Sequence, residues 1–152
     1  MTTGRQIAAG SGPVGYALAH ATRAHRSVLQ RRMAQLGLHL GQELLIVDIH
    51  HNPDTTQAEL VQRIGLEQPT IAKALTRMER TGFIQRTADP GDRRVTRLRL
   101  TERGEAVVAA VTAEWAETEA QATAGLTDAE ARQLIRLLTT VRDSLEQSTP
   151  SR

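Results

Sequence analysis

The chain has 152 residues, of which 39% are hydrophobic, with a formal net charge of +2 and no cysteine. This length suits one folded domain, and the lack of cysteine excludes a disulfide framework and thiol-based redox sensing. No apolar run approaches the roughly 20 residues of a membrane-spanning helix, and the start of the chain lacks the pattern of a secretory signal. We therefore expect a cytoplasmic protein with no membrane partner.

The charges are unevenly distributed along the chain. Residues 63–99 hold nine basic and four acidic side chains, whereas residues 100–152 hold five basic and nine acidic ones. A basic segment next to an acidic one indicates that the middle of the chain faces a polyanion, although a solvated charged surface would have the same composition.

The first two predicted elements are helices. Apolar residues follow helical spacing over residues 13–36, starting at Pro13, which suits a first helical turn, and ending before Gly37. A second, shorter helix is expected over residues 40–49. It is closed by two histidines and the turn residues Asn52 and Pro53.

A helix-turn-helix pattern follows. Thr56 and Glu59 have the spacing of a capping box, which opens a third helix that Gly65 stops. Pro69 suits the first turn of a fourth helix, which runs to Gly82. This helix is expected to bury one apolar stripe, made by Ile71, Ala74, Leu75 and Met78, and to turn a polar, cationic side outward.

The next residues predict a β-hairpin. Strands are expected over residues 83–86 and 95–100, joined by the turn sequence of residues 89–92, and Arg93 and Arg94 lie at the tip. Thr101 then caps a fifth helix that ends near Gly125. A second capping box opens a sixth, which carries one apolar stripe of Leu134, Leu137, Leu138, Val141 and Leu145.

Together these elements predict a mainly α protein with a small β-hairpin wing, an α+β winged helix-turn-helix. We expect a single domain over residues 13–147 between disordered tails at 1–12 and 148–152. Its DNA-binding core is expected over 38–100, with dimerisation helices over 13–36 and 101–147. A helix-turn-helix places one helix in the major groove, whose base edges carry a sequence code, and arginines at a wing tip suit the minor groove.

The residues from Leu60 to Val108, with LTRMERTGFIQRTADPGDRRVTRLRLTERGEAV at their centre, resemble the signature of the MarR (multiple antibiotic resistance regulator) family. The resemblance extends over about residues 13–145. It implies a homodimer that binds a palindromic operator in double-stranded DNA through recognition helices about one DNA turn apart.

The resemblance also implies residue roles. Gln68, Thr70 and Lys73 fall where the family reads bases, Arg77 and Arg86 where it holds phosphates, and Arg94 where a wing arginine enters the minor groove, oriented by Asp92. Arg93 is expected to add phosphate affinity. The predicted DNA-binding set is Thr56, Gln57, Gln68, Pro69, Thr70, Lys73, Arg77, Arg86, Asp92, Arg93 and Arg94.

Small aromatic, phenolic or anionic ligands often shift members of this family away from the DNA-binding spacing, so the resemblance implies a repressor released by such an effector. The candidate ligand residues are Tyr16, His20, Arg23, His39 and Trp115. No cofactor, metal site or catalytic residue is predicted, and the sequence does not identify the effector.

Three other functions compete with this one. An enzyme is disfavoured because the chain has no cysteine, no glycine-rich phosphate loop and no nucleophile elbow, and its five histidines lack an HExxH spacing. A metal-responsive regulator of the same fold and a sequence-neutral architectural DNA-binding protein remain alternatives. The polar recognition helix argues against the second of these.

Overall fold

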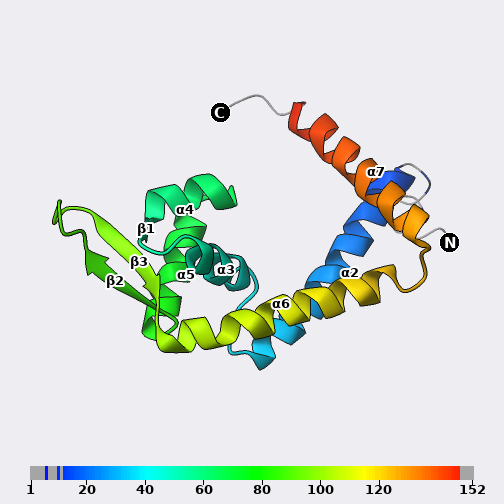
Figure 1. Ribbon diagram of the computed structural model, residues 1–152. Coiled ribbons are helices and arrows are strands. Elements are labelled where there is room, and N and C mark those ends of the chain that lie inside the picture. Colours follow the sequence, from blue (N-terminus) through cyan, green and yellow to red (C-terminus); the bar gives the residue numbers. More distant parts are fainter. Residues whose placement is uncertain (1–5, 7–9, 11, 148–152) are drawn as a thin grey trace. The chain divides into compact units, whose positions relative to one another are not determined.

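The computed structural model describes residue 6, residue 10 and residues 12–147 (Figure 1). The expected disordered tails fall mostly outside these residues, although Gln6 and Gly10 have helical backbone. The described chain divides into two compact units, one up to Ala116 and one from Glu117.

From Pro13 onward, the described part of the first unit contains four complete helices: α2 (Pro13–Gln35), α3 (Gln42–His51), α4 (Gln57–Ile64) and α5 (Gln68–Arg80). It also contains the start of α6 (Glu102–Thr123). Both predicted stop signals hold: Gly37 follows α2 with φ 75°, and Gly65 ends α4 with φ 70°. Glycine tolerates this left-handed backbone because it has no Cβ.

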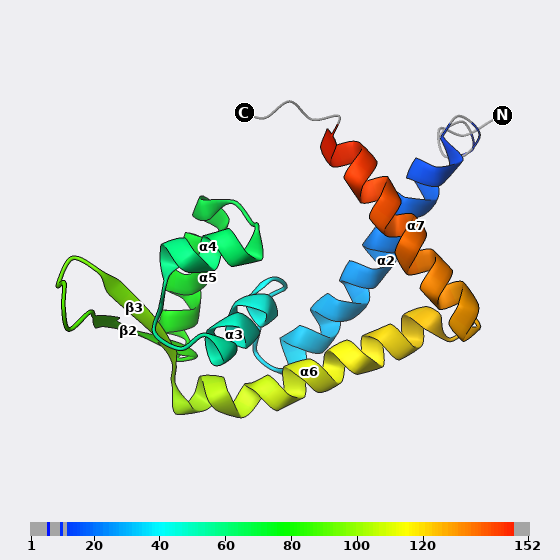
Figure 2. The same ribbon diagram turned by 45° about the horizontal axis from the view of Figure 1, so that its top comes forward.

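A three-stranded antiparallel sheet completes the unit, in the order β1 (Thr55–Thr56), β3 (Thr96–Leu100), β2 (Ile84–Ala88). The expected hairpin is confirmed, but its first strand begins one residue later and ends two residues later than predicted. Strand β1 was not predicted, because two residues are too few to show an alternating pattern. Helix α5 packs beside β2, and the turn of the hairpin projects away from the helices (Figure 2).

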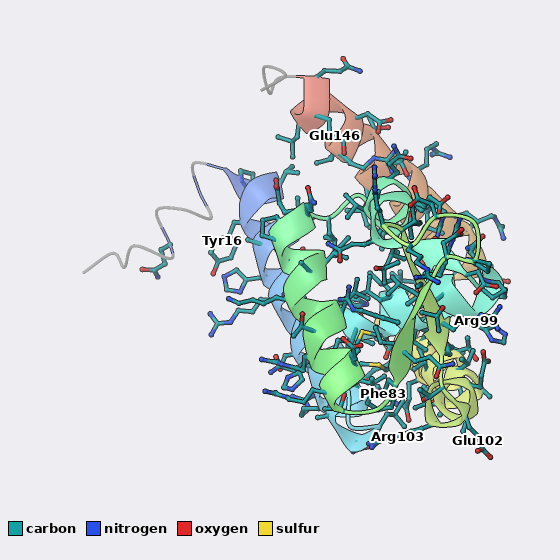
Figure 3. The ribbon with its side chains drawn as sticks, turned by 90° about the vertical axis from the view of Figure 1, so that its left-hand side faces the viewer. Tyr16, Phe83, Arg99, Glu102, Arg103 and Glu146 are labelled. Carbon is teal, nitrogen blue, oxygen red and sulfur yellow. The ribbon has the colours of Figure 1, made fainter. Side chains whose placement is uncertain are left out.

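The core of the first unit joins its helices to the hairpin. Phe83, Ile84, Leu98 and Leu100 bring the hairpin into it, and α5 buries Ile71, Leu75 and Met78 as expected. Leu29 and Met33 of α2 and Val108 and Val111 of α6 extend the same cluster. The guanidinium of Arg103 also lies 4.5 Å above the Phe83 ring, a cation–π contact at the base of the wing (Figure 3). The hairpin and α5 are therefore held against one common core.

The second unit contains the end of α6 and all of α7 (Asp128–Gln147). The predicted capping box at its start is confirmed: the Thr127 N–H donates to Glu130 Oε2 at 2.8 Å, and the Glu130 N–H donates to Thr127 Oγ1 at 3.3 Å. None of the described residues of α7 is buried, and its exposed apolar side chains include Leu134, Leu137, Leu138 and Leu145.

A buried carboxylate lies in the first turn of α3. Glu43 is only 3% exposed, and its Oε2 accepts a hydrogen bond from the Gly41 N–H at 2.6 Å. Desolvation raises the pKa of Glu43 above its usual range, while backbone hydrogen bonds and the charge of Arg26 lower it less. Because the pKa of the Glu43 carboxyl is higher in the folded than in the unfolded protein, its protonation stabilises the fold. This contribution is complete at pH values below the unfolded-state pKa and is lost as the pH rises through the folded-state pKa.

We therefore expect Glu43→Gln to raise the melting temperature at pH 7 and to give little or no gain at pH 4. Glutamine keeps an oxygen that can accept from Gly41 and carries no charge to desolvate. Thermal unfolding at both pH values checks this, with the exposed Glu102→Gln as a control. A stabilisation that is equal at pH 4 and pH 7 would contradict the proposed cost of ionising Glu43.

Candidate nucleic-acid interface

Helix α5 presents a polar, cationic face to solvent. This face lines an open hollow of about 670 Å³ formed by Pro69, Thr70, Ala72, Lys73, Thr76, Arg77 and Arg80. All of these side chains are exposed apart from half-buried Ala72. They recur every three or four residues opposite the buried stripe, so the helical period that packs α5 on the core also gathers its polar groups on one side.

The tip of the wing is organised by two aspartates. Asp89 Oδ1 accepts from the backbone N–H groups of Gly91 at 2.7 Å and Asp92 at 3.0 Å. Asp92 Oδ1 accepts from the backbone N–H of Arg94 at 2.9 Å. In this structure Asp92 therefore contacts Arg94 through the Arg94 backbone. The Arg93 and Arg94 side chains are both exposed.

The basic side chains of residues 63–99 fall into two groups. Four of them form ion pairs within the chain: Arg63 with Asp48, Arg86 with Glu79, Arg97 with Asp89, and Arg99 with Asp54. Within the described part of the chain, no ion pair is formed by the other five, which are Lys73, Arg77, Arg80, Arg93 and Arg94. The five cations without an acidic partner belong to α5 and to the wing tip.

The paired groups show the corresponding electrostatic shifts. The Arg97 guanidinium lowers the pKa of Asp89, and the Arg99 guanidinium lowers the pKa of Asp54. In return the hydrogen bond to Asp89 raises the pKa of Arg97, and that to Asp54 raises the pKa of Arg99. Both pairs therefore remain charged at neutral pH, and their arginines are largely neutralised by the protein itself.

Residues 38–96, the segment that contains this face and the tip of the wing, match the MarR family. This chain is therefore similar to the MarR family over its helix-turn-helix and wing tip. Its mainly helical fold with a small antiparallel sheet is that of the winged-helix proteins of this family, as the sequence predicted.

Solved structures of similar transcriptional regulators share this fold. The transcriptional regulator SlyA is 28% identical with a TM-score of 0.75, covering 87% of this chain and 93% of that chain. PcaV from Streptomyces coelicolor is 25% identical with a TM-score of 0.79, covering 88% of this chain and 97% of its own. A point mutant of MarR from E. coli, solved in complex with operator DNA, shares the fold at 20% identity, with a TM-score of 0.78 over 89% of this chain and 97% of that one.

Several residues of the predicted DNA-binding set have structural contacts within the chain. Thr56 Oγ1 accepts from the Glu59 N–H at 3.2 Å, so this side chain caps α4 in the predicted box. Arg86 Nε donates to Glu79 Oε2 at 3.1 Å, which ties β2 to the end of α5. Gln57 is half-buried in the first turn of α4, while Gln68 is exposed at the start of α5 next to Pro69.

Three residues of the α5 face were missing from the set predicted from sequence: Ala72, Thr76 and Arg80. Arg80 follows Arg77 by three residues and Lys73 by seven, so helical spacing alone places it on the same side. That spacing would have been sufficient to include it.

The structure places the five candidate ligand residues in different surroundings. The rings of Tyr16 and His20 contact each other on α2 with centroids 4.3 Å apart, and Arg23 lines a separate open hollow of about 470 Å³ on the same helix. His39 lines a small hollow of about 150 Å³ next to Lys73 and Arg77. Trp115 is half-buried against the core. Helical periodicity predicted that Tyr16, His20 and Arg23 lie on one helix. It could not predict where His39 and Trp115 lie relative to that helix.

Residues 6, 10 and 12–147 hold neither a metal-binding cluster nor a membrane-spanning helix. In this part of the chain no three His, Asp or Glu side chains come together in a way that could hold a metal ion. None of its helices combines the length and apolar character needed to cross a membrane.

Proposed function

We propose that this protein is a MarR-family, sequence-specific transcriptional regulator that binds a palindromic operator in double-stranded DNA as a homodimer. One observation carries the proposal: the cations of residues 63–99 that have no acidic partner among the described residues are confined to the α5 face and the wing tip. Cations that the protein leaves unneutralised on two neighbouring elements are available to phosphates and base edges.

The two elements suit different grooves. Helix α5 exposes Thr70 and Lys73 in its first two turns, where a recognition helix contacts bases in the major groove. Arg93 and Arg94 lie on a narrow two-stranded hairpin that fits the minor groove, whose negative potential attracts arginine. Arg77, further along α5, is placed to hold a phosphate, and Arg86 would do so only by sharing its guanidinium with Glu79.

The test begins with selection of a duplex from a randomised pool by the wild-type protein. We expect Thr70→Ala or Lys73→Ala to weaken binding by about 1 to 3 kcal/mol and to relax preference at particular base pairs, because a base contact is lost. Arg77→Ala should weaken binding to every sequence and lower the slope of log affinity against log salt by about 0.9, because one phosphate contact is lost. Fluorescence anisotropy over a salt series measures both.

Exposed Arg132→Ala on α7 serves as the control and should leave binding unchanged. Failure of the wild-type protein to enrich any sequence would contradict specific recognition and favour the architectural alternative. Uniform weakening by the Thr70 and Lys73 variants would refute their assignment as base readers.

We further propose that the protein is a repressor released by a small aromatic or phenolic anion. The Tyr16–His20 ring pair and the neighbouring cation Arg23 support a site on α2 for a ring that carries a negative charge. PcaV, a protein of the same fold, has been solved in complex with its natural ligand. A thermal-shift screen of aryl carboxylates and phenols, followed by release of the selected duplex, tests this. Equal release from wild type, Arg23→Ala and His20→Ala would place the site elsewhere.

A further inference from the structure

The wing is connected to the helix-turn-helix by a chain of polar contacts that begins at Asp89. One carboxylate oxygen of Asp89 holds the turn through the Gly91 and Asp92 N–H groups, as described above. The other, Oδ2, accepts from Arg97 Nε on β3 at 2.6 Å. The Asp89 N–H also donates to the Val95 carbonyl at 2.9 Å. This single residue therefore joins the turn that carries Arg93 and Arg94 to the neighbouring strand.

Arg97 continues the connection beyond the wing. Its NH1 donates to the backbone carbonyl of Asp54 at 3.1 Å and lies 3.9 Å from Glu59 Oε2, in the capping box of α4. Asp54 has a left-handed φ of 65°, which is unusual for a residue with a side chain, and its N–H donates to the Leu98 carbonyl at 3.1 Å. Its carboxylate pairs with Arg99. Arg97 thus bridges the wing turn, the start of β1 and the start of α4.

The contacts of Arg97 restrain the position of the wing tip. A two-stranded ribbon is only marginally rigid by itself, and the tip projects beyond the buried part of the sheet. The backbone contacts of β1 with β3 join Thr55 to Leu98 and Thr56 to Arg97, so they support the strands of the ribbon as far as Arg97 but not the turn beyond them. The bidentate geometry of arginine lets one side chain restrain both places at once.

We infer that Asp89 and Arg97 are positioning residues that fix the wing arginines relative to α5 without contacting DNA themselves. This inference rests on the proposed DNA-binding function. The inference also predicts the direction in which DNA affinity changes when Asp89 loses its charge. Asp89 is an acidic residue on a surface proposed to meet phosphates, so long-range electrostatics alone would make binding stronger without its charge. If Asp89 instead positions the wing, removing its charge weakens binding.

The experiment uses the full-length protein, the duplex selected by the wild type and three variants: Asp89→Asn, Arg97→Lys and the double variant. Arg97→Lys keeps the positive charge, so a simple phosphate contact would survive, but an ammonium lacks the planar fork that spans Asp89 and the Asp54 carbonyl. We expect each single variant to weaken binding about five- to tenfold, and the double variant to be no weaker than either single one.

The salt slope should fall by no more than about 0.9, because the phosphate contact of Arg93 is the one that a misplaced wing would lose. Discrimination between A·T and G·C pairs should fall at those positions where Arg94→Ala also abolishes it. Thermal unfolding followed by circular dichroism identifies any variant that is unfolded at the assay temperature. The conservative variant Asp89→Glu then replaces the unfolded variant in the comparison with the wild type.

Each remaining outcome is decisive. Tighter binding by Asp89→Asn, wild-type binding by Arg97→Lys, or additive losses in the double variant would each overturn the positioning role. Arg94→Ala separates this failure from that of the proposed function. If Arg94→Ala weakens binding while the Asp89 and Arg97 variants do not, only the inference fails. If Arg94→Ala also binds normally, the proposed wing contact itself is wrong.

Discussion

Gly104→Ala is expected to destabilise the first unit by about 3 kcal/mol, the cost of forcing an atom into a closely packed site. A Cβ at this position would lie 2.1 Å from the carbonyl oxygen of Phe83 and 3.1 Å from Leu100 Cβ. The carbonyl cannot move freely, because it accepts the Thr101 N–H at 3.0 Å. The start of α6 would therefore be pushed away from the base of the wing.

Thermal unfolding measures the effect, and a loss of this size corresponds to a fall of roughly 10 °C. Gly15→Ala is the matched control: this helical glycine of α2 is exposed and a Cβ there would meet nothing within 4 Å. It should be neutral or stabilising by up to about 1 kcal/mol, since alanine favours helix over glycine. Equal melting temperatures for the wild type and the Gly104→Ala variant would show that the turn at Phe83 adjusts easily.

Leu138→Asp in α7 is expected to convert the proposed dimer into a monomer and to lower operator affinity at least about 100-fold. Leu138 is 44% exposed and belongs to a row with Leu134 and Leu145, which are 43% and 59% exposed. An apolar row of this kind on a small domain indicates burial against a second copy. A charge placed there would have to be desolvated at the interface, and a monomer would engage only one half-site.

Light scattering at micromolar concentration and anisotropy with the selected duplex test this prediction together. Thr139→Asp adds the same charge to the same helix on the side away from the row, and should remain dimeric. A wild-type mass of 16.6 kDa would contradict the dimer itself. A Leu138→Asp variant that is still dimeric would show that the interface lies elsewhere.

Much of the fold was determined by short-range patterns in the sequence. The capping boxes at Thr56 and Thr127, the glycine after α4 and the buried stripe of α5 each depend on residues within a few positions of one another. Their geometry is set by the period of the helix and by the backbone groups at its ends, so the sequence predicts them without knowledge of the remaining chain. Local patterns also predicted the hairpin, and the MarR resemblance then assigned roles to its residues.

Other features depended on which distant segments meet. The sequence has nine basic side chains over residues 63–99, but it does not show which four of them form ion pairs within the chain. Two of the acidic partners, Asp48 and Asp54, lie many positions away from Arg63 and Arg99. Strand β1 is only two residues long, and it is defined by its hydrogen bonds to β3 rather than by its own pattern.

The wing contains both kinds of feature: some are set by neighbouring residues, and others by contacts between distant segments. The spacing of Asp89, Gly91 and Asp92 predicted a turn, and the two arginines after it marked the tip. Only the tertiary structure brought Arg97 to Asp89 and to the Asp54 carbonyl, 43 positions earlier in the chain. Local conformation follows from neighbouring residues, whereas the contacts of a long charged side chain follow from the folding of the whole unit, which decides what lies within its reach.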